Sequence, residues 1–268
     1  MKIAVLGSNG FVGRNLTERF KYAGNEVFEL NRTAINLLDP RAVRDWLENN
    51  KPDVVINAAA VIGHPELLAD TYNNLGIFMN FYDNAHNFGR MINLASGAEF
   101  DRDYSLEKTA EARIMERMPK DSYGFGQNIK SRLSLHRDNY YTLRIFNCFG
   151  PGEPKTRLIP RFLASESEFK ISNDRYFDYF GIDDLYTVVK HYSVAKYRYT
   201  VLRDINCVYL DKIKISEFLA MFCETRGISN DSWSIESSSD IHYTGGGDKL
   251  VNLGLDLLGL RKCLERYR

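Results

Sequence analysis

Seven residues near the N-terminus have the types and spacing that hold a diphosphate: Gly7-Ser8-Asn9-Gly10-Phe11-Val12-Gly13. In such a motif the first glycine allows a tight turn, the second lets the backbone approach a pyrophosphate, and the third permits close packing of helix on strand. A helix that starts here offers unpaired N–H groups and a positive dipole end to the phosphates. The alternative is a plain strand–helix turn, but the strand–turn–helix context favours a site for NAD or NADP. The predicted contacts are Gly7, Asn9, Gly10, Phe11, Val12 and Gly13.

The end of the second predicted strand discriminates between the two cofactors. A carboxylate there usually binds the ribose 2′-hydroxyl of NAD, whereas an arginine accommodates the 2′-phosphate of NADP. The sequence reads Glu29-Leu30-Asn31-Arg32, with Glu29 inside the strand and Asn31 and Arg32 at its tip. A guanidinium can bind phosphate through two hydrogen bonds, so this pair favours NADP and leaves NAD possible. A solvated surface arginine is the alternative.

The elements that position these residues follow from the pattern of apolar side chains. Short β-branched runs alternate with helical patterns over the first 150 residues, which is typical of βαβ units. One helix ends before Gly24, and a second begins at Pro40. The predicted fold class is α/β, a Rossmann-type doubly wound parallel sheet. The predicted strands are Lys2–Leu6, Glu26–Leu30, Val54–Asn57, Arg90–Leu94 and Thr142–Phe146, and two later helices are Tyr72–Asn87 and Tyr123–Arg137.

The character of the sequence changes after Gly150-Pro151-Gly152. Beyond this point the alternation of short apolar runs with helical patterns weakens, and short polar turns become more frequent. We therefore expect a dinucleotide-binding Rossmann domain over residues 1–150 and a substrate-binding region over 151–268 that partly returns to the sheet.

Composition narrows the possible partners and compartments. Lys plus Arg total 35 and Asp plus Glu total 35, so no net charge favours nucleic acid or an anionic membrane as a partner. No apolar run approaches the roughly 18 residues of a membrane span. The four cysteines are scattered, with no histidine at metal-ligand spacing, which predicts no metal site and reduced thiols in a cytoplasmic protein.

Beyond the glycine motif, the chain resembles the extended short-chain dehydrogenase/reductase family, and within it the nucleotide-sugar epimerases, dehydratases and reductases. The resemblance covers nearly the whole chain, most clearly residues 1–185. It implies that Asp39 contacts the adenine, that Ala58, Ala59 and Ala60 line the cofactor, and that Asn74 lies in the central helix behind the site. The matching segments are GSNGFVG (7–13), NLLD (36–39), NAAAVIG (57–63), YNNLG (72–76), INLASGAEF (92–100), SYGFGQNIK (122–130), LRIFNCFGPGE (143–153) and FDYFGIDDL (177–185).

The same resemblance identifies the candidate catalytic residues. Ser96 and Tyr123 match the catalytic Ser and Tyr of the family, and Ser96, Ala98 and Asn147 would contact the sugar nucleotide. Reduction of a ketone needs a hydride donor, a proton donor at the carbonyl oxygen and a second hydrogen-bond donor to that oxygen. A phenol and a hydroxyl supply the last two. The alternatives are a serine that only caps a turn and a tyrosine that only packs.

One departure from the family pattern concerns the helix that carries Tyr123. The family has a lysine four residues after the tyrosine, on the same helix face, where it holds the nicotinamide ribose and lowers the pKa of the phenol. Gln127 occupies that position here, and Lys130 lies a further turn along. Without a cation the phenol is a poor base and remains a good acid. The replacement of lysine by Gln127 therefore favours a mechanism of reduction only over one that begins with oxidation. It is also compatible with a protein that binds the cofactor but has little turnover.

Further differences from the family patterns argue against dehydration and against epimerisation of the fucose-synthase type. Dehydratases carry an Asp-Glu pair where this chain has Gly97 and Ala98. Fucose-synthase-type epimerases use a Cys and a His where it has Ala98 and Arg157. Glu99 either reaches the sugar or is structural, and His64 is the only histidine near the expected site.

These observations lead to a prediction with two rivals. The predicted activity is NADP-preferring reduction of a nucleotide-linked 4-keto-6-deoxy sugar. The rivals are a sugar-nucleotide 4-epimerase that retains NAD and a non-catalytic cofactor-binding subunit. The resemblance also implies a homodimer through the helices Tyr72–Asn87 and Tyr123–Arg137.

Overall fold

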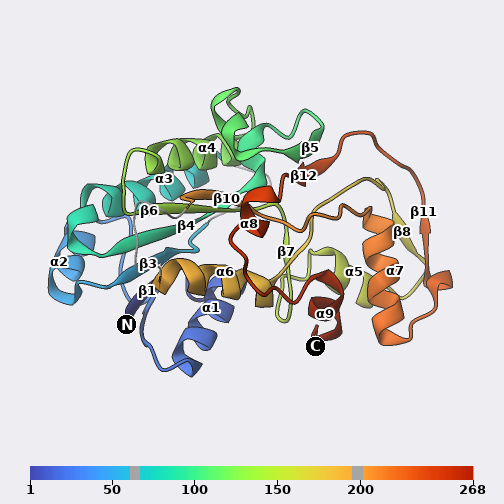
Figure 1. Cartoon of the computed structure of the whole chain (residues 1–268), viewed down its shortest axis with the longest axis horizontal. Helices are drawn as coiled ribbons and strands as arrows, with labels where there is room; N and C mark the ends of the chain where they lie inside the picture. Colours follow the sequence, from blue (N-terminus) through green and yellow to red (C-terminus); the bar gives the residue numbers. More distant parts are fainter. Residues whose placement is uncertain (61–66, 195–201, 268) are drawn as a thin grey trace.

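A six-stranded sheet forms the centre of the larger part of the molecule (Figure 1). The computed structural model describes residues 1–60, 67–194 and 202–267; His64 and the end of the segment 57–63 lie outside them. The strand order is β10-β6-β4-β3-β1-β2, and every neighbouring pair is parallel. The strands are β1 (Lys2–Leu6), β2 (Glu26–Leu30), β3 (Val54–Asn57), β4 (Arg90–Ser96), β6 (Tyr140–Ile145) and β10 (Asp204–Cys207).

The order of the strands reverses between β1 and β3. The chain runs from β1 outward to β2, then crosses back to β3 on the other side of β1 and continues through β4 and β6. This is the doubly wound arrangement predicted from the sequence, and it is confirmed. In such sheets, ligands bind beyond the carboxyl ends of the strands, at the point of reversal.

Helices cover both faces of this sheet. Figure 1 shows α3 and α4 on one side and α1 and α6 on the other. Each face has its own apolar core: Leu16, Phe20 and Val188 pack on one side, and Val43 and Phe78 on the other. Strands covered on both faces explain why the central strands read as continuous apolar runs. The helices are α1 (Phe11–Tyr22), α2 (Pro40–Asn50), α3 (Leu68–Asp83), α4 (Ser122–Ser134) and α6 (Ile182–Val194).

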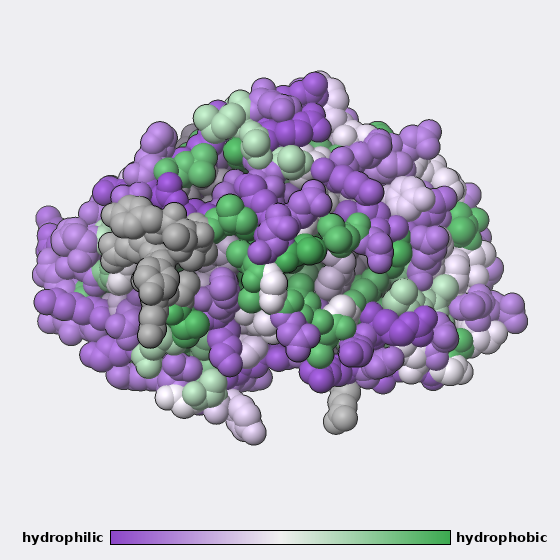
Figure 2. Space-filling view, in the orientation of Figure 1, coloured by the Kyte–Doolittle hydropathy of each residue, from purple (hydrophilic) through white to green (hydrophobic). Residues whose placement is uncertain are grey.

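A smaller lobe packs beyond the carboxyl ends of the strands and has an aromatic core that includes Phe149, Phe162 and Phe218. On the face seen in Figure 2, apolar side chains gather mainly in the middle of the molecule, and hydrophilic ones cover the two ends. The elements of this lobe and its connections are β7 (Cys148–Phe149), α5 (Leu158–Leu163), β8 (Phe169–Ile171), β9 (Phe180–Gly181), α7 (Ile215–Arg226), β11 (Trp233–Ile235), α8 (Asp248–Val251) and α9 (Leu260–Glu265).

Two short strands near the site come from distant parts of the sequence. Strand β5 (Leu106–Thr109) pairs in parallel with β12 (Tyr243–Gly245), so the segment after β4 lies beside a segment near the C-terminus. The remaining short 3-10 turns are η1 (Ala85–Asn87), η2 (Gly97–Phe100), η3 (Glu111–Met115) and η4 (Asn230–Ser232).

The ends of several predicted elements differ from the structure. The helix predicted over Tyr72–Asn87 begins at Leu68 and ends at Asp83, and that predicted over Tyr123–Arg137 ends at Ser134. The strand predicted over Thr142–Phe146 begins at Tyr140, and Phe146 lies outside it. Tyr140 is part of an aromatic cluster with Phe78 and Phe88, and such tertiary packing is not visible in a local pattern.

Candidate active site

The glycine motif forms a close-packed turn between β1 and α1. Gly7 has a φ of +71°, and a Cβ on it would lie 2.8 Å from the Cα of Ala59. A Cβ on Gly13 would lie 2.2 Å from the carbonyl oxygen of Gly7. Gly10 is the N-cap of α1, and no side chain caps that end, so the first N–H groups of the helix remain available to an anion. The arrangement fits the pyrophosphate of a dinucleotide.

Asn31 and Arg32 lie at the tip of β2, as the sequence predicted. The Asn31 amide donates to the Oδ1 of Asn9 at 3.3 Å and to the Oγ of Ser8 at 3.4 Å. Its own oxygen accepts from the backbone N–H groups of Thr33 and Ala34. Asn31 therefore joins the tip of β2 to the glycine turn. Arg32 is exposed beside it, and its contact with a 2′-phosphate stays a prediction.

The remaining predicted cofactor residues lie around the same strand ends. Ala58, Ala59 and Ala60 follow β3 and line a pocket together with Phe11 and Val12. Asn74 is buried on α3. Asp39 is the N-cap of α2, and its Oδ1 accepts from the backbone N–H of Arg41 at 2.9 Å. This carboxylate thus has a structural partner, and its contact with adenine stays a prediction.

A pocket of about 180 Å³ lies at the carboxyl ends of β1, β3, β4 and β6, the position expected at the reversal of strand order. Its lining includes Ser96 and Tyr123, the predicted catalytic pair, and also Asn147. The residues predicted to line the cofactor and those predicted to be catalytic come from different elements and face one cavity. The full lining is Phe11, Val12, Ala58, Ala59, Ala60, Leu94, Ser96, Tyr123, Ile145, Phe146, Asn147, Cys148 and Arg157.

Ser96 ends β4 and begins the turn η2. Its Oγ accepts from the backbone N–H of Ala98 at 3.2 Å, and its own backbone N–H donates to the Oε1 of Glu99 at 3.1 Å. This reciprocal pair is a capping box, which fixes the conformation of the serine. Of the two roles that the sequence left open for Glu99, the structural one holds, because its side chain is fully buried.

Tyr123 lies in the first turn of α4 and lines the same pocket as Ser96. Burial raises the pKa of the Tyr123 phenol, and the neighbouring side chains of Ser96 and Gln127 partly lower it again. Gln127 is 2% exposed, and its Oε1 has no hydrogen-bond partner among the described residues. That buried acceptor could take a hydrogen bond from a cofactor hydroxyl. This fits a residue that stands where the family has the lysine that holds the nicotinamide ribose.

The charges around the phenol differ from those expected with a lysine at position 127. Arg102, which forms an ion pair with Asp121 at 2.7 Å, lowers the pKa of Tyr123, and Glu99 raises it. Lys130 is 1% exposed and lies in the interior near Glu99. Burial lowers the pKa of Lys130 to about 8, and the charge of Glu99 opposes that shift. The cation that acts on the phenol is thus a guanidinium outside α4.

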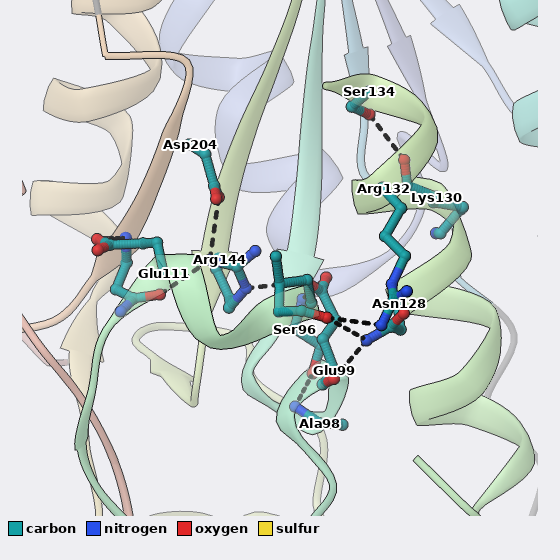
Figure 3. A network of polar contacts seen from close by, with 12 residues as sticks. Ser96, Ala98, Glu99, Glu111, Asn128, Lys130, Arg132, Ser134, Arg144 and Asp204 are labelled. Atoms are coloured by element: carbon teal, nitrogen blue, oxygen red, sulfur yellow. Dashed lines mark hydrogen bonds and ion pairs between the residues drawn. The ribbon is translucent and has the colours of Figure 1, made fainter. Parts of the chain in front are cut away.

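A buried ion pair holds the serine turn in place (Figure 3). The Nε of Arg144, on β6, donates to the Oε2 of Glu99 at 2.8 Å, and neither side chain is exposed. The same guanidinium donates to Asn206 at 3.0 Å and lies 3.0 Å from Asp204, both on β10. Burial raises the pKa of Glu99, and the Arg144 charge opposes that rise.

A second buried side chain ties the turn to α4. The Asn128 amide donates to the backbone oxygen of Glu99 at 2.9 Å (Figure 3). A Cβ on Gly124 would lie 2.5 Å from the backbone oxygen of Ala98, so the helix approaches the turn very closely. The distance between Ser96 and Tyr123 is therefore set by buried contacts.

In the wall of the same pocket, the Oδ1 of Asn147 accepts a hydrogen bond from Arg157, and the predicted contact of Asn147 with substrate stays a prediction. Arg157 replaces the histidine of the fucose-synthase pattern and brings a cation to the cavity wall. Ala98 is 1% exposed and is not among the residues that line this pocket, and its predicted contact with substrate stays a prediction.

Sequence reasoning did not find three residues beside the site: Arg102, whose charge acts on Tyr123, Arg144, which binds Glu99 of the serine turn, and Tyr243, which packs on Phe146 of the pocket. A charged residue inside the apolar run of β6 was a signal for Arg144, because a buried charge needs a partner. Arg102 and Tyr243 come from segments that the tertiary fold brings to the site, and no local pattern marks them.

Within residues 1–60, 67–194 and 202–267, no group of three or more His, Cys, Asp or Glu side chains could hold a metal ion. None of the helices there is long and apolar enough to cross a membrane. The cysteines Cys148, Cys207, Cys223 and Cys263 are free and buried.

A doubly wound sheet with a glycine turn and a Ser–Tyr pair at the reversal of strand order defines a dinucleotide-dependent enzyme of the short-chain dehydrogenase/reductase type. The sequence profile of the NAD dependent epimerase/dehydratase family matches residues 3–189. The chain belongs to this family, and the resemblance stated from the sequence is confirmed.

Individual relatives are distant. The chain is 22% identical to a GDP-L-colitose synthase of Yersinia pseudotuberculosis over 47% of this chain and 43% of that protein. It is 24% identical to a GDP-L-fucose synthase of Azorhizobium caulinodans over 57% of this chain and 53% of that protein. The matches therefore span about half of these relatives. A GDP-mannoheptose C4 reductase from Campylobacter jejuni, solved with NADP bound, shares the fold with a TM-score of 0.81 at 20% identity, over 99% of this chain and 96% of that chain.

The buried ion pair generates a stability prediction. Arg144→Met leaves Glu99 buried without its cation, and we expect a loss of about 3–5 kcal/mol in the free energy of unfolding, measured by urea denaturation at neutral pH. The loss should shrink toward pH 5, because the folded variant binds a proton at Glu99 that the unfolded chain binds only at lower pH. The control is Arg113→Met, since the Arg113–Glu116 pair is about half exposed and should contribute under about 1 kcal/mol. Equal losses in the two variants contradict the prediction.

Proposed function

We propose that the protein is an NADPH-dependent reductase of a nucleotide-linked 4-keto-6-deoxy sugar. The observation that carries this proposal is the position of Tyr123, which lines the same pocket as Ser96 at the ends of the strands and whose phenol has a pKa raised by burial. A phenol in that state stays protonated at neutral pH. It can give a proton to a carbonyl oxygen, but it is a poor base for the oxidation of an alcohol.

Each residue of the site has a separate role in the proposed reduction. NADPH, when bound, supplies a hydride to the carbonyl carbon. Ser96 donates a hydrogen bond to the carbonyl oxygen, and Tyr123 transfers its proton to that oxygen as negative charge develops there. Gln127 lies one turn after Tyr123 on α4, and because its Oε1 is unpartnered within the described chain, that oxygen is available to a ribose hydroxyl. The open N-terminus of α1 faces the pyrophosphate.

NADPH is favoured over NADH by the tip of β2. Arg32 is exposed next to Asn31, which is itself held on the glycine turn by Asn9. A guanidinium at this place can bind a 2′-phosphate. The C4 reductase of similar fold was solved with NADP, which supports the same choice.

The substrate class rests on the relatives and on the groups that the pocket lacks. The relatives described above are named for GDP-linked sugars, and one is a C4 reductase. Dehydration requires an acid/base pair after Ser96, where this chain has Gly97 and Ala98. Epimerisation at carbons next to the ketone requires proton carriers, where it has Ala98 and Arg157. Simple reduction needs neither.

The rival functions predict different behaviour. A 4-epimerase must oxidise before it reduces, so it should retain NAD through purification, whereas a reductase should exchange its cofactor. A non-catalytic subunit should bind NADPH without turnover.

The homodimer stays a proposal that the exposed Leu68 and Tyr72 of α3 and Phe125 of α4 support. A cytoplasmic location is proposed from the four free thiols.

The direct test is a screen of 4-keto sugar nucleotides in which the loss of NADPH absorbance is followed. We expect turnover by the natural protein and a loss of about 10²–10⁴-fold in kcat for Tyr123→Phe, with NADPH binding unchanged, because the variant lacks only the proton donor. Tyr22→Phe, which alters an exposed tyrosine of α1, is the control. If Tyr123→Phe keeps full activity, the proton donor is another residue. If the natural protein binds NADPH and reduces none of the substrates, the non-catalytic function replaces the reductase.

The residue at position 127 generates a prediction about pH. In Gln127→Lys an ammonium beside Tyr123 would stabilise the phenolate and lower the pKa of the phenol. Reduction needs the protonated phenol and slows as the pH rises through that pKa. The basic limb of the kcat profile should therefore move to lower pH, and the reverse oxidation should become measurable at lower pH. Gln127→Leu, which adds no charge, should not shift the limb downward. A profile that is unchanged in Gln127→Lys would show that Tyr123 does not control the limb.

Cofactor choice gives a separate prediction. Arg32→Ala should weaken NADPH binding by about 1.5–3 kcal/mol, the usual value of a charged hydrogen bond, and leave NADH binding nearly unchanged. Titration of each reduced cofactor with the two proteins measures both values, and NADH serves as the internal control. An equal loss for both cofactors, or tighter binding of NADH by the natural protein, removes the assignment of NADPH.

A further inference from the structure

One cation lies in the wall of the catalytic pocket and has no carboxylate partner in the described part of the chain. Of the described residues that line this pocket, Arg157 alone carries a charge at neutral pH. Its guanidinium donates one hydrogen bond, to the Oδ1 of Asn147, and forms no ion pair within the described residues. An arginine side chain has five N–H donors, so most of them remain available to a ligand.

The acidic side chain of the same loop does not neutralise this cation. The Oε1 of Glu153 accepts a hydrogen bond from the hydroxyl of Tyr267 at 2.9 Å, and Glu153 is only 9% exposed. Burial raises the pKa of Glu153 to about 7, while the hydrogen bond from Tyr267 and the charge of Arg157 oppose that rise. At neutral pH this carboxyl group is therefore only partly ionised, and it is already bonded elsewhere.

The loop that carries Arg157 is attached to the cofactor-binding part of the protein. The guanidinium of Arg14 donates to the backbone oxygen of Gly152 at 3.3 Å, and the amide of Asn15 donates to that of Pro151 at 3.2 Å. Both donors belong to α1, the helix that begins at the glycine turn. The loop is therefore held in place from outside the pocket, whether or not a substrate is present.

Asn147 fixes the guanidinium and adds donors of its own. Its backbone oxygen accepts from the N–H of Phe180 at 2.9 Å, which anchors it beside β9. Because the amide has one oxygen and one NH2 group, pairing of the oxygen with Arg157 turns the NH2 group to the other side. That group has no partner among the described residues. Arg157 and Asn147 thus present N–H donors and one positive charge.

We propose that Arg157, held by Asn147, binds an oxyanion of the substrate, which is either a phosphate of the nucleotide or a carboxylate on the sugar. The inference rests on the proposed function, because it concerns the substrate of the same pocket. A planar guanidinium fits both groups, since it donates two parallel hydrogen bonds to two of their oxygens. The bond to Asn147 also lowers the conformational entropy that the arginine loses when a ligand binds.

The test measures binding to the NADPH-loaded protein by calorimetric titration, and it therefore needs no turnover. The probes form two series: UDP, UDP-glucose and UDP-glucuronate, and GDP, GDP-mannose and GDP-mannuronate. The first two compounds of each series carry only phosphate charges, whereas the third also carries a carboxylate on the sugar. The two sources of an oxyanion are thereby separated.

Arg157→Gln removes the charge and keeps a polar side chain. We expect binding that is about 10- to 100-fold weaker, the usual effect of losing a hydrogen bond to a charged group. If Arg157 binds a phosphate, the three compounds of a series that binds should all weaken. If it binds a carboxylate, only the sugar acid should weaken. That second result leaves the inference standing and replaces the 6-deoxy sugar of the proposed function by a sugar acid.

Arg161→Gln is the matched control. Arg161 is an exposed arginine of α5, its guanidinium lies 5.6 Å from the ring centre of Phe169, and it does not line the pocket. Its substitution should leave the affinities nearly unchanged. Equal losses in the two variants overturn the proposal, because they indicate a general attraction of this surface for anions. Unchanged binding in Arg157→Gln, or no binding of either series by the natural protein, overturns it as well.

A second variant tests the link to Asn147. Asn147→Asp keeps the shape of the side chain and places a carboxylate beside Arg157, where it competes with the ligand for the guanidinium. We expect a loss of affinity at least as large as in Arg157→Gln, and an unchanged affinity overturns the proposal. NADPH titration shows whether each variant is folded. Should Asn147→Asp fail to fold, Arg157→Gln decides alone, because position 157 is exposed.

Turnover separates this inference from the proposed function. Binding that depends on Arg157, in a protein that reduces no 4-keto sugar nucleotide, ends the reductase proposal and leaves the inference standing. Reductase activity with the same KM for the sugar nucleotide in Arg157→Gln supports the proposed function and overturns the inference.

Discussion

The geometry of the site depends on the buried ion pair between Glu99 and Arg144. Two charges without solvent exposure are tolerated only when they are paired and their other hydrogen bonds are made, and removal of either partner leaves an uncompensated charge. Arg144 reaches the turn after β4 on one side and Asn206 and Asp204 on β10 on the other. One guanidinium thus links the ends of three neighbouring strands. Because displacement of the turn that contains Ser96 would separate these buried charges, the ion pair holds that turn in place.

The rest of the site is built outward from that turn. The Asn128 amide holds α4 against the backbone of Glu99, and the missing side chain of Gly124 lets the helix come close. Tyr123, one residue before Gly124, is thereby brought to Ser96. Tyr243, on β12, packs on Phe146, which lines the same pocket, and β12 is anchored at Asp178. The elements around the pocket are therefore fixed by contacts in the protein interior.

The sequence predicted those features that local patterns encode. The glycine turn and the parallel strands each depend on residues close together in the chain, and the fold and the family were predicted correctly. Ser96 and Tyr123 came from the resemblance to the family, and their catalytic roles stay a prediction. The ends of α3 and β6 were missed because aromatic packing around Tyr140 extends the strand beyond its β-branched run. Arg102 and Tyr243 were missed for a different reason. Each comes near the site only through the tertiary fold, Tyr243 by packing on Phe146 and Arg102 by its charge, and a single sequence carries no mark of that proximity.

The absence of a lysine at position 127 is best understood together with the charges that remain. Arg102 is paired with Asp121 and partly exposed, so water and the carboxylate weaken its effect on Tyr123. The buried carboxylate of Glu99 acts in the opposite direction. Burial adds to that rise and leaves the phenol less acidic than in water. Each unit by which a pKa exceeds the ambient pH reduces the fraction of base tenfold and leaves the acid almost undiminished. The environment of Tyr123 therefore favours proton donation, the direction that a ketone reduction requires, over proton removal.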